Sequence, residues 1–411
     1  MIRAWVLAVA ALALLAGPAS AAQLVTWDVP SKVVDVSKFT FNKPPDTPDR
    51  PKALKVDVLL PDGYGGTKQF PVLWLLHGHG DAYDSWPNPR NGDLLNTAKG
   101  LNAIVVMPEA ATGWYTNWWD GGARGADGSA WEDYHLDELM PYVNARLKIL
   151  AGRQNHAIAG LSMGGEGAIY YAEQLPGYFG AAATFSGVLS LERPEWPTGF
   201  DTQGQKFADV YGDPHGAWLR GHDPTGLVRN LRYTRLFVRV GDGTPDPTDP
   251  NQVKNYFGQV AELDLRQHAM DFVSAATAAG ENVTYQPTQG IHDWPYWRAA
   301  LKAAIKWNFF APTQESPTAW TYSTVRQHGR AWDMAYAFAK PLDDVATFTR
   351  AGETLKAAGS GTVTVTVDGR PAFTAALPFE RTLPAATPKP HRHHKHHKHR
   401  KHHPRRHRAR A

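Results

Sequence analysis

The sequence contains no cysteine among its 411 residues. That absence excludes disulfide bridges, thiolate metal sites and a cysteine nucleophile, so an exported form must be stabilised by its packed core. Long apolar runs are also missing, since no stretch beyond the N-terminus reaches the roughly 18 consecutive apolar residues of a transmembrane helix. With 43% apolar and 20% charged residues, the composition indicates a globular protein and excludes collagen, coiled-coil and wholly disordered classes.

Acidic residues are absent from residues 389–411, which hold ten Lys or Arg and nine His. Removing those ten positive charges from the net charge of +4 leaves residues 1–388 at −6. We predict a disordered tail over residues 385–411, because so few apolar side chains cannot offset chain entropy. The tail is either a passive solvated segment or a binder of anionic cell-wall polymer or a metal ion. Specific nucleic-acid binding is not expected beside an acidic body.

The N-terminus has the parts of a secretory signal peptide. Arg3 precedes the apolar run 4–16, and a Gly-Pro break leads to the small residues Ala19-Ser20-Ala21. We therefore predict a signal peptide over residues 1–21 and a secreted or cell-envelope protein. The alternative, an uncleaved membrane anchor, is disfavoured because the run is short for a bilayer span.

Residues 54–310 alternate short β-branched runs with stretches of helical period, which predicts a three-layer α/β domain with a mostly parallel sheet. We assign this domain to residues 22–312. The expected strands are 54–61, 72–77, 103–108, 157–161, 181–186, 235–240 and 283–286. The expected helices are 132–150, 165–175, 253–279 and 296–310. Two aperiodic excursions, 112–130 and 191–223, are expected to be loops that shape a substrate pocket.

After Pro312 the pattern changes to short segments of β character. The expected strands are 319–325, 334–340, 345–350, 361–367 and 371–378. We predict a small β-rich domain over residues 313–384.

Ser162 is the predicted nucleophile. It lies at the centre of Gly160-Leu161-Ser162-Met163-Gly164, a G-x-S-x-G motif placed between an expected strand and an expected helix. In that context the tight turn exposes the serine hydroxyl, and the small flanking residues avoid clashes with neighbouring elements. The helix that follows also directs its positive N-terminus at the site.

His292 is the predicted general base. It follows the last expected strand and precedes the last expected helix, so a short loop brings it to the carboxyl edge of the sheet. His268, inside an expected helix, is a weaker alternative. Several carboxylates are candidates for the acid that orients the imidazole, and sequence spacing alone favours Asp242 or Asp246.

The oxyanion hole is predicted at His77-Gly78-His79-Gly80, directly after an early strand. We assign its two donors to the backbone N–H groups of His79 and Met163. The residues His77, Trp114, Trp118 and Trp294 lie in or beside the site loops and are candidates for binding substrate, with core packing as the alternative for each.

Six segments together resemble the esterase D superfamily of α/β-hydrolases, and within it the secreted mycolyltransferases. They are GLSMGG at 160–165, WYTNW at 114–118, WE at 131–132, HDPT at 222–225, GDGTP at 241–245 and HDWPYW at 292–297. The resemblance covers about residues 55–310 and implies an α/β-hydrolase three-layer sandwich. It also implies that the triad acid is Glu262, which stands ten residues before Phe272 as the family's catalytic glutamate does before a helix phenylalanine.

One departure from the mycolyltransferases bears on function. They carry Asp-Gly-Leu-Arg at the oxyanion strand, where this chain has His77-Gly78-His79-Gly80, which looks like the hydrolytic members of the superfamily. The resemblance therefore implies an exported serine carboxylesterase acting on a small-molecule, lipid or sugar acyl ester. The alternatives are an acyltransferase to trehalose or another sugar, and a non-catalytic surface binding protein. The sequence has no phosphate-binding loop or dinucleotide glycine pattern, so we expect no cofactor and no metal in the body.

Overall fold

The computed structural model of the chain describes residues 21–35, 54–119, 121, 130–201 and 204–386. The predicted signal peptide lies outside these residues except for Ala21, and the predicted tail lies outside them from Thr387 onward. Within the described ranges, no helix combines the length and the apolar character needed to cross a membrane.

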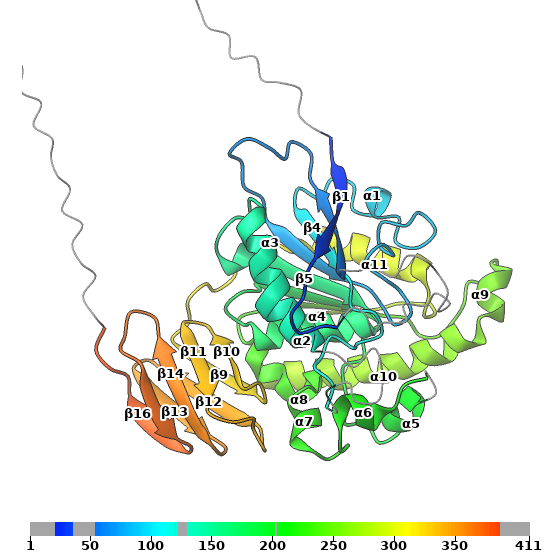
Figure 1. Cartoon of the computed structure of the whole chain (residues 1–411). Coiled ribbons are helices and arrows are strands. Elements are labelled where there is room, and N and C mark those ends of the chain that lie inside the picture. Colours follow the sequence, from blue (N-terminus) through cyan, green and yellow to red (C-terminus); the bar gives the residue numbers. More distant parts are fainter. Residues whose placement is uncertain (1–20, 36–53, 120, 122–129, 202–203, 387–411) are drawn as a thin grey trace, which may run out of the picture.

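An eight-stranded mixed sheet forms the centre of the larger domain (Figure 1). Its strands are β1 (Gln23–Val29), β2 (Leu54–Leu60), β3 (Val72–Leu76), β4 (Ile104–Pro108), β5 (His156–Leu161), β6 (Ala181–Phe185), β7 (Arg235–Val240) and β8 (Asn282–Pro287). They lie in the order β1-β2-β4-β3-β5-β6-β7-β8, in which β1–β2 and β2–β4 are antiparallel and all later pairs are parallel. The mostly parallel sheet is confirmed, and β1 is an edge strand that the sequence analysis missed.

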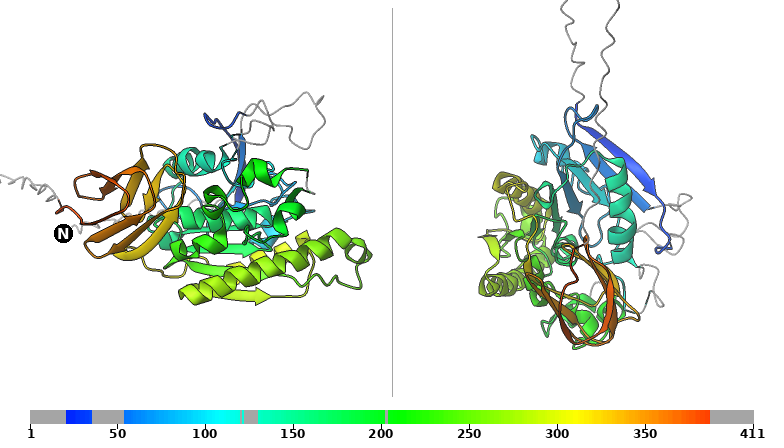
Figure 2. Two further views of the ribbon diagram at one scale, coloured as in Figure 1. Left: turned by 90° about the horizontal axis from the view of Figure 1, so that it is seen from below. Right: turned by 90° about the vertical axis from the view of Figure 1, so that its left-hand side faces the viewer.

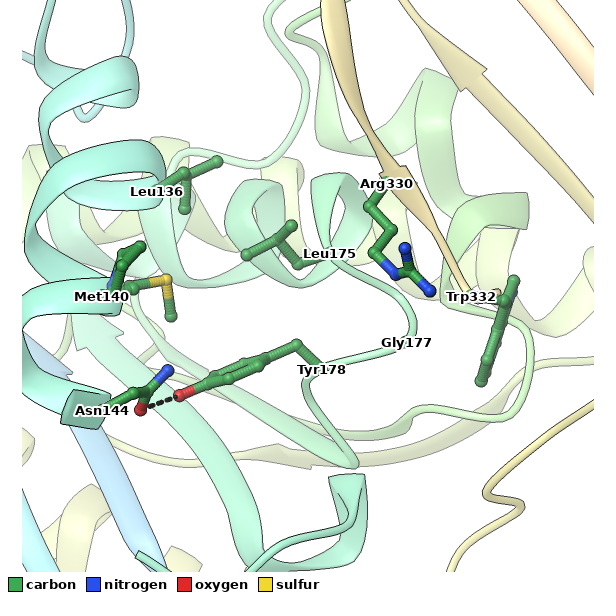
Figure 3. A pocket seen from close by; sticks show the side chains of 9 residues that line it. Leu136, Met140, Asn144, Leu175, Gly177, Tyr178, Arg330 and Trp332 are labelled. Carbon is green, nitrogen blue, oxygen red and sulfur yellow. Dashed lines mark hydrogen bonds between the residues drawn. The ribbon is translucent and has the colours of Figure 1, made fainter. Parts of the chain in front are cut away.

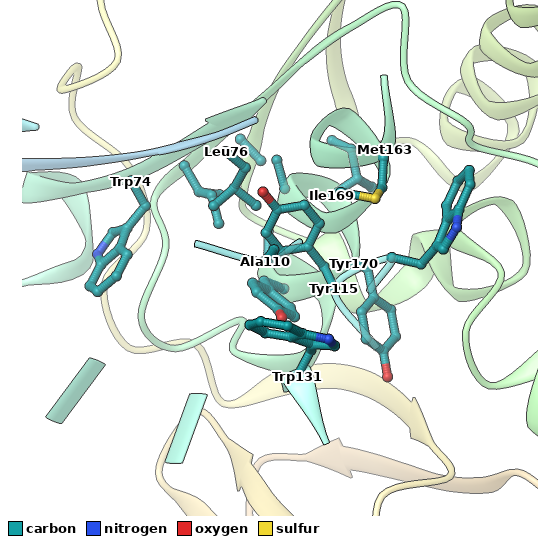
Figure 4. Close-up of a cluster of buried hydrophobic side chains, with 14 of the residues drawn as sticks. Trp74, Leu76, Ala110, Tyr115, Trp131, Met163, Ile169 and Tyr170 are labelled. Carbon is teal, nitrogen blue, oxygen red and sulfur yellow. The ribbon is translucent and has the colours of Figure 1, made fainter. Parts of the chain in front are cut away.

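Helices cover both faces of this sheet, as the alternating side chains of β3 show. Trp74 packs into a cluster that includes Ile169 of α4 (Met163–Gln174) and Phe272 of α10 (Tyr256–Ala279), and Figure 4 shows part of it. Leu73 and Leu75 face the other cluster, which includes residues of α1 (Leu94–Thr97) and α11 (Trp294–Trp307). Burial on both faces explains why the strands read as continuous apolar runs.

Two of the expected helices differ from the sequence prediction. The first is shorter and composite, with α2 (Trp131–Asp133), a π-helical stretch η2 (Tyr134–Leu139) and α3 (Met140–Arg146). The other divides into α9 (Pro250–Lys254) and α10 because Asn255 leaves the helical backbone and its side chain caps the Gly258 N–H.

The second expected loop, residues 191–223, contains three short helices in its described part. It contains α5 (Trp196–Asp201), α6 (Phe207–Tyr211) and α7 (Ala217–Arg220), and α8 (Pro224–Leu227) and the 3₁₀ turn η4 (Val228–Leu231) follow. Phe200, Phe207 and Tyr211 are buried and contact one another. Packing against the body, rather than a helical period, therefore orders this segment.

The C-terminal part is a sandwich of two four-stranded antiparallel sheets beside the larger domain (Figure 2). Its strands are β9 (Ala319–Thr324), β10 (His328–Ala331), β11 (Met334–Phe338), β12 (Ala346–Ala351), β13 (Thr354–Ala358), β14 (Thr362–Val367), β15 (Phe373–Ala376) and β16 (Phe379–Thr382). The sheet orders are β10-β11-β14-β15 and β16-β13-β12-β9. Alternate residues such as Val363, Val365 and Val367 are buried in its separate core. The β character is confirmed, while β10, β13 and β16 were not predicted.

Candidate active site

Ser162 sits on a strained turn between β5 and α4. Its backbone has φ 52° and ψ −123°, which non-glycine residues rarely adopt. The turn leaves no room for side chains on either side of it: a Cβ at Gly160 would lie 2.0 Å from the Gly164 carbonyl oxygen, and one at Gly164 would lie 2.3 Å from the His77 carbonyl oxygen. The glycines of the motif are thus required by close packing, and the strand-turn-helix context expected for Ser162 is present.

Ser162, His292 and Glu262 form one continuous chain of hydrogen bonds. The Ser162 Oγ lies 2.9 Å from His292 Nε2, and His292 Nδ1 lies 2.9 Å from Glu262 Oε2. Three separate elements supply these groups: the β5–α4 turn, the loop after β8, and α10. The His292 loop is tied to α10 because the His292 N–H donates to the Gly258 carbonyl at 2.9 Å.

Glu262 is buried and its other carboxyl oxygen is also engaged. Glu262 Oε1 accepts hydrogen bonds from the Ser186 hydroxyl at 2.6 Å and from the Gly241 N–H. With only 1% of the residue exposed, the carboxylate orientation is fixed on every side. Asp242, by contrast, accepts from the Thr244 and Gly290 N–H groups. Sequence spacing favoured Asp242 or Asp246 as the acid beside the imidazole, but the carboxylate that contacts the His292 ring is that of Glu262.

Asp246 and His268 also lie in other networks. Asp246 Oδ1 accepts from the Thr248 N–H at 2.8 Å and stabilises its own loop. The His268 Nδ1 accepts from the Ser190 N–H at 3.1 Å, and its ring packs against Trp196. Neither side chain has a recorded contact with Ser162.

The predicted oxyanion loop runs beside the serine. A Cβ on Gly78 would lie 2.5 Å from Leu161 Cδ1 and 3.5 Å from Ser162 Cβ, so the Gly78 backbone is in close contact with the elbow. The carboxylate of Asp81 accepts from the Gly78 N–H at 3.3 Å and holds the loop, and burial raises the pKa of Asp81. Met163 is the first residue of α4, where a backbone N–H has no acceptor within its own helix.

His77 is buried, and its side chain contacts main-chain groups of the oxyanion loop and of the segment after β4. Its ring contacts the Gly78 carbonyl through Nδ1 at 2.9 Å and accepts from the Ala110 N–H through Nε2 at 3.0 Å. Burial alone would lower the pKa of His77, but the hydrogen bond and charge of Glu109 outweigh it and the pKa is raised. These contacts favour support of the main chain over the substrate-binding role expected for His77.

Trp114 and Trp118 are likewise packed inside the protein. Trp114 is 2% exposed and lies against Phe200 with ring centroids 4.6 Å apart, and Trp118 is 7% exposed. Their burial favours core packing, the alternative kept open for these rings in the sequence analysis, over contact with substrate. Trp294 is only partly buried, and its ring packs edge-on against Trp86 and Trp297.

Sequence reasoning missed two residues at the site, Ser186 and Gln205. Ser186 follows β6 at the same edge as Ser162 and has φ 52°, and its place after a parallel strand was a usable signal. Gln205 Oε1 accepts from the Trp114 indole at 2.8 Å and lies 3.3 Å from His79 Nε2. Gln205 belongs to the aperiodic excursion, where no pattern singled it out.

No group of three or more histidine or acidic side chains in the described part of the chain is arranged to hold a metal ion. The arrangement is that of a serine activated by an imidazole, with a carboxylate behind the imidazole. Such a set is suited to nucleophilic attack on an acyl carbon.

Comparisons with known proteins agree with this chemistry. The profile of a family described as "Putative esterase" matches residues 50–308. Esterase Rv1288 of Mycobacterium tuberculosis is 32% identical over 243 residues, 55% of this chain and 49% of the relative. Diacylglycerol acyltransferase/mycolyltransferase Ag85A of Mycobacterium gordonae is 29% identical over 252 residues, 58% of this chain and 72% of the relative.

The fold has relatives among solved structures. The serine hydrolase FphF of Staphylococcus aureus superposes with a TM-score of 0.52 at 21% identity, covering 72% of this chain and 100% of that one. At this identity the match establishes the fold alone. The chain spans about half the length of the curated esterase it matches at 32% identity.

Proposed function

The chain belongs to the esterase family, and on that premise we propose that it is a serine carboxylesterase that works through a covalent acyl-enzyme. The observation that carries the proposal is the unbroken hydrogen-bond chain from Ser162 Oγ through His292 to Glu262. Ser162 is the proposed nucleophile, His292 the general base and acid, and Glu262 the group that orients the imidazole.

In the acylation step, Ser162 Oγ attacks the ester carbonyl carbon while His292 Nε2 takes the hydroxyl proton. The carbonyl oxygen becomes an oxyanion in the tetrahedral intermediate. The carbon–oxygen bond to the alcohol then breaks, and His292 returns the proton to the departing alkoxide. Glu262 remains ionised and stabilises the imidazolium that exists between the two proton transfers.

The backbone N–H groups of His79 and Met163 are the proposed donors to the oxyanion. Removing one such donor in other enzymes costs about 2.7–4 kcal/mol in the transition state. Because both groups belong to the main chain, their positions depend on the elbow and on the Gly78 loop. The close packing of Gly78 and Gly164 supports this assignment, since it holds the two segments against each other.

Deacylation repeats the chemistry with water. His292 takes a proton from the water, the resulting hydroxide attacks the acyl carbon, and the bond to Ser162 Oγ breaks as His292 reprotonates the serine. A sugar hydroxyl in place of water would make the protein an acyltransferase. The 29% identity to a mycolyltransferase supports that second candidate, whereas the His77–Gly80 segment favours water.

The substrate class and acceptor are tested with p-nitrophenyl esters of graded chain length, with and without trehalose or glucose. Nitrophenol release that disappears in Ser162→Ala and does not respond to sugar supports the esterase. Acylated sugar formed at the expense of free acid supports the transferase. If no ester is turned over in a Ser162-dependent way, the enzymatic proposal is wrong and a binding protein is favoured.

We also propose export, from the N-terminal segment alone. Residues 1–21 have the charge, apolar run and small residues of a signal peptide. N-terminal sequencing of protein recovered from the medium or envelope fraction tests this, with a start near Ala22 as the expected result.

A further inference from the structure

The C-terminal sandwich is joined to the larger domain through a buried cation. Arg326 follows β9, and only 5% of its side chain is exposed. Its guanidinium lies 3.0 Å from Glu132, 3.3 Å from Asp133 and 2.7 Å from Asp137. All three carboxylates belong to α2 and η2, directly after the excursion 112–130 that the sequence analysis associated with a substrate pocket.

The Arg326 guanidinium compensates the negative charge of the buried Glu132 carboxylate. Burial by itself would raise the pKa of Glu132, yet the charge of Arg326 and bonds from neighbours hold that pKa below its usual value. Glu132 Oε1 also accepts from the Tyr170 hydroxyl of α4 at 2.9 Å, so the same carboxylate touches the helix that begins at Ser162. Tyr170, Trp131 and Met163 belong to one cluster of buried side chains, which Figure 4 shows.

Other contacts also join the two domains: the Asn230 side chain hydrogen-bonds the Ser323 N–H and carbonyl, and the Tyr322 hydroxyl donates to Gln174 Oε1. A cavity of about 300 Å³ lies between the domains and is lined by Met140, Tyr178, Arg330 and Trp332, among others (Figure 3). Its polar groups are already engaged, since Tyr178 donates to Asn144 and Arg330 pairs with Asp368. Toward α2 and η2 the sandwich presents the buried Arg326, and beside it the exposed His328, whose Nε2 lies 3.2 Å from Asp137.

From α2 a path of contacts continues to the loop of Trp114 and Tyr115. The Asp133 N–H donates to Asn117 Oδ1 at 3.2 Å, and Asn117 also forms an isolated β-bridge with Ala130. Trp114 and Tyr115 have φ values of 56° and 51°, a left-handed conformation that is unfavourable for bulky residues. Two consecutive strained residues keep such a backbone only when the surrounding contacts impose it.

Both strained residues contact the predicted oxyanion loop, residues 77–80. The Tyr115 hydroxyl lies 3.0 Å from the His77 N–H and 3.1 Å from the His77 carbonyl. The Trp114 indole donates to Gln205, whose Oε1 lies 3.3 Å from His79 Nε2, and the Trp114 and His79 rings lie 5.8 Å apart. The loop therefore supports the segment that would supply one oxyanion donor.

We propose that the C-terminal sandwich is required for full catalytic activity. Its Arg326 is a positioning residue that fixes the Trp114–Tyr115 loop and thereby the oxyanion loop at His79. The proposal rests on the esterase activity proposed above. Arg326 touches no reacting atom and acts through Asp133, Asn117 and the loop. Its removal is expected to lower the rate of the chemical step more than the binding of substrate.

The test compares full-length Arg326→Met and Arg326→Lys with the control Arg330→Met, which breaks an exposed ion pair of the sandwich beside the cavity between the domains. For Arg326→Met we expect kcat to fall about tenfold or more with KM changed less than about threefold, because a small misplacement of catalytic groups strongly affects rate. Lysine retains the charge but not the fork of donors, so it is expected to recover part of kcat. Arg330→Met is expected to retain wild-type kcat.

A second variant separates positioning from simple loss of folding. Arg326→Met leaves the buried Glu132 with only His222, 3.6 Å away, in place of its guanidinium partner, and Arg326→Met/Glu132→Gln removes the acidic charge. We expect the double variant to regain thermal stability while its kcat stays low. If its kcat returns to the wild-type value along with stability, Arg326 only joins the domains and the proposal is wrong.

Hydrogen exchange gives a readout that does not depend on activity. Peptides covering residues 112–118 and 77–80 are expected to exchange at least about threefold faster in the double variant, with β6 unchanged. Unchanged protection of those peptides overturns the positioning inference whatever the kinetics show. If the wild type lacks Ser162-dependent turnover, the proposed function fails, and this exchange comparison still decides the role of Arg326.

Discussion

The two domains bury charged and polar groups in different ways. In the sandwich, the buried Arg350 meets Asp333 and the buried Arg326 meets carboxylates of the larger domain. In the larger domain, Glu166 and Glu173 of α4 are buried without an ion pair among the described residues, and burial raises the pKa of both well above the usual value. The helix that follows Ser162 thus buries two carboxyl groups without a cation, whereas the buried arginines of the sandwich each face a carboxylate.

This difference indicates where the molecule tolerates change. The sandwich follows a simple alternation of buried and exposed residues, so each position is specified by its own neighbours. Around Ser162, one backbone turn satisfies several requirements at once: the glycine contacts, the strained serine and the loop of Gly78. We therefore expect substitutions near the elbow to have much larger effects than comparable ones in the sandwich.

The largest effect is expected at the acid behind the imidazole. Glu262→Gln is close in size, but it removes the charge that selects the productive imidazole tautomer, and kcat is expected to fall about 10³–10⁴-fold. Asp242→Asn serves as the matched control, because the Asp242 side chain accepts the Thr244 and Gly290 N–H groups and does not meet the imidazole, and kcat is expected to stay within about twofold of wild type. A larger loss in Asp242→Asn than in Glu262→Gln would reassign the acid.

The second effect concerns stability and compares two glycines. Gly164→Ala places a Cβ 2.3 Å from the His77 carbonyl oxygen, and overpacking of this kind is expected to lower the free energy of unfolding by about 3 kcal/mol. Gly352→Ala in the turn after β12 meets open space at φ +60°, so only the backbone preference of about 1 kcal/mol is lost. Urea titrations of both variants measure the difference, and equal losses would contradict the proposed contrast.

The third effect is a dependence of stability on pH that originates in the larger domain. Burial raises the pKa of Asp223 from 3.8 to about 7. In the unfolded chain this carboxyl releases its proton near pH 4, so unfolding between about pH 4 and 7 releases a proton and stability falls as pH rises. We expect the Tm of the larger domain, measured by calorimetry, to fall between pH 4 and 7. Where the two domains unfold in separate transitions, the Tm of the sandwich is the reference.

Asp223→Asn provides the control for that slope. The side chain keeps an acceptor for the Leu191 N–H but no longer titrates, so the decrease in Tm between pH 4 and 7 is expected to become shallower. A slope that is unchanged in this variant would assign the pH dependence to other groups.

The smallest effect is expected at Ser186. Its hydroxyl donates to Glu262 at 2.6 Å, and Ser186→Ala is expected to lower kcat about tenfold through looser positioning of the carboxylate. Ser323→Ala, which removes a hydroxyl pair with Thr347 in the sandwich, is the control and leaves kcat unchanged. Equal kcat values for the two variants would show that Gly241 alone suffices to orient Glu262.

What could be predicted from the sequence is what depends on local pattern. The elbow at Ser162 is encoded in five consecutive residues, and the buried parallel strands stand out because burial on both faces requires uninterrupted apolar runs. The acid could not be chosen by spacing, because Glu262 reaches His292 across the sheet edge from α10, and only the family resemblance pointed to it.

Other misses have different physical causes. Trp114 and Trp118 were considered candidates for contact with substrate because large aromatic side chains serve both binding and core packing, and sequence does not separate the two uses. Gln205 gave no signal, since it acts through tertiary contacts within an aperiodic segment. The short strand β10 reads His-Gly-Arg-Ala and has only one buried residue, too little for a periodic pattern.

The strand order has a consequence for how the chain folds. β5, which leads into the elbow, pairs with β3 on one side and β6 on the other, and β4 lies outside β3. Residues 72–76 must therefore find partners about eighty positions later before the centre of the sheet exists. Such distant pairings are slow to form, so the serine turn is expected to gain its protection late in refolding, after the local hairpins of the sandwich.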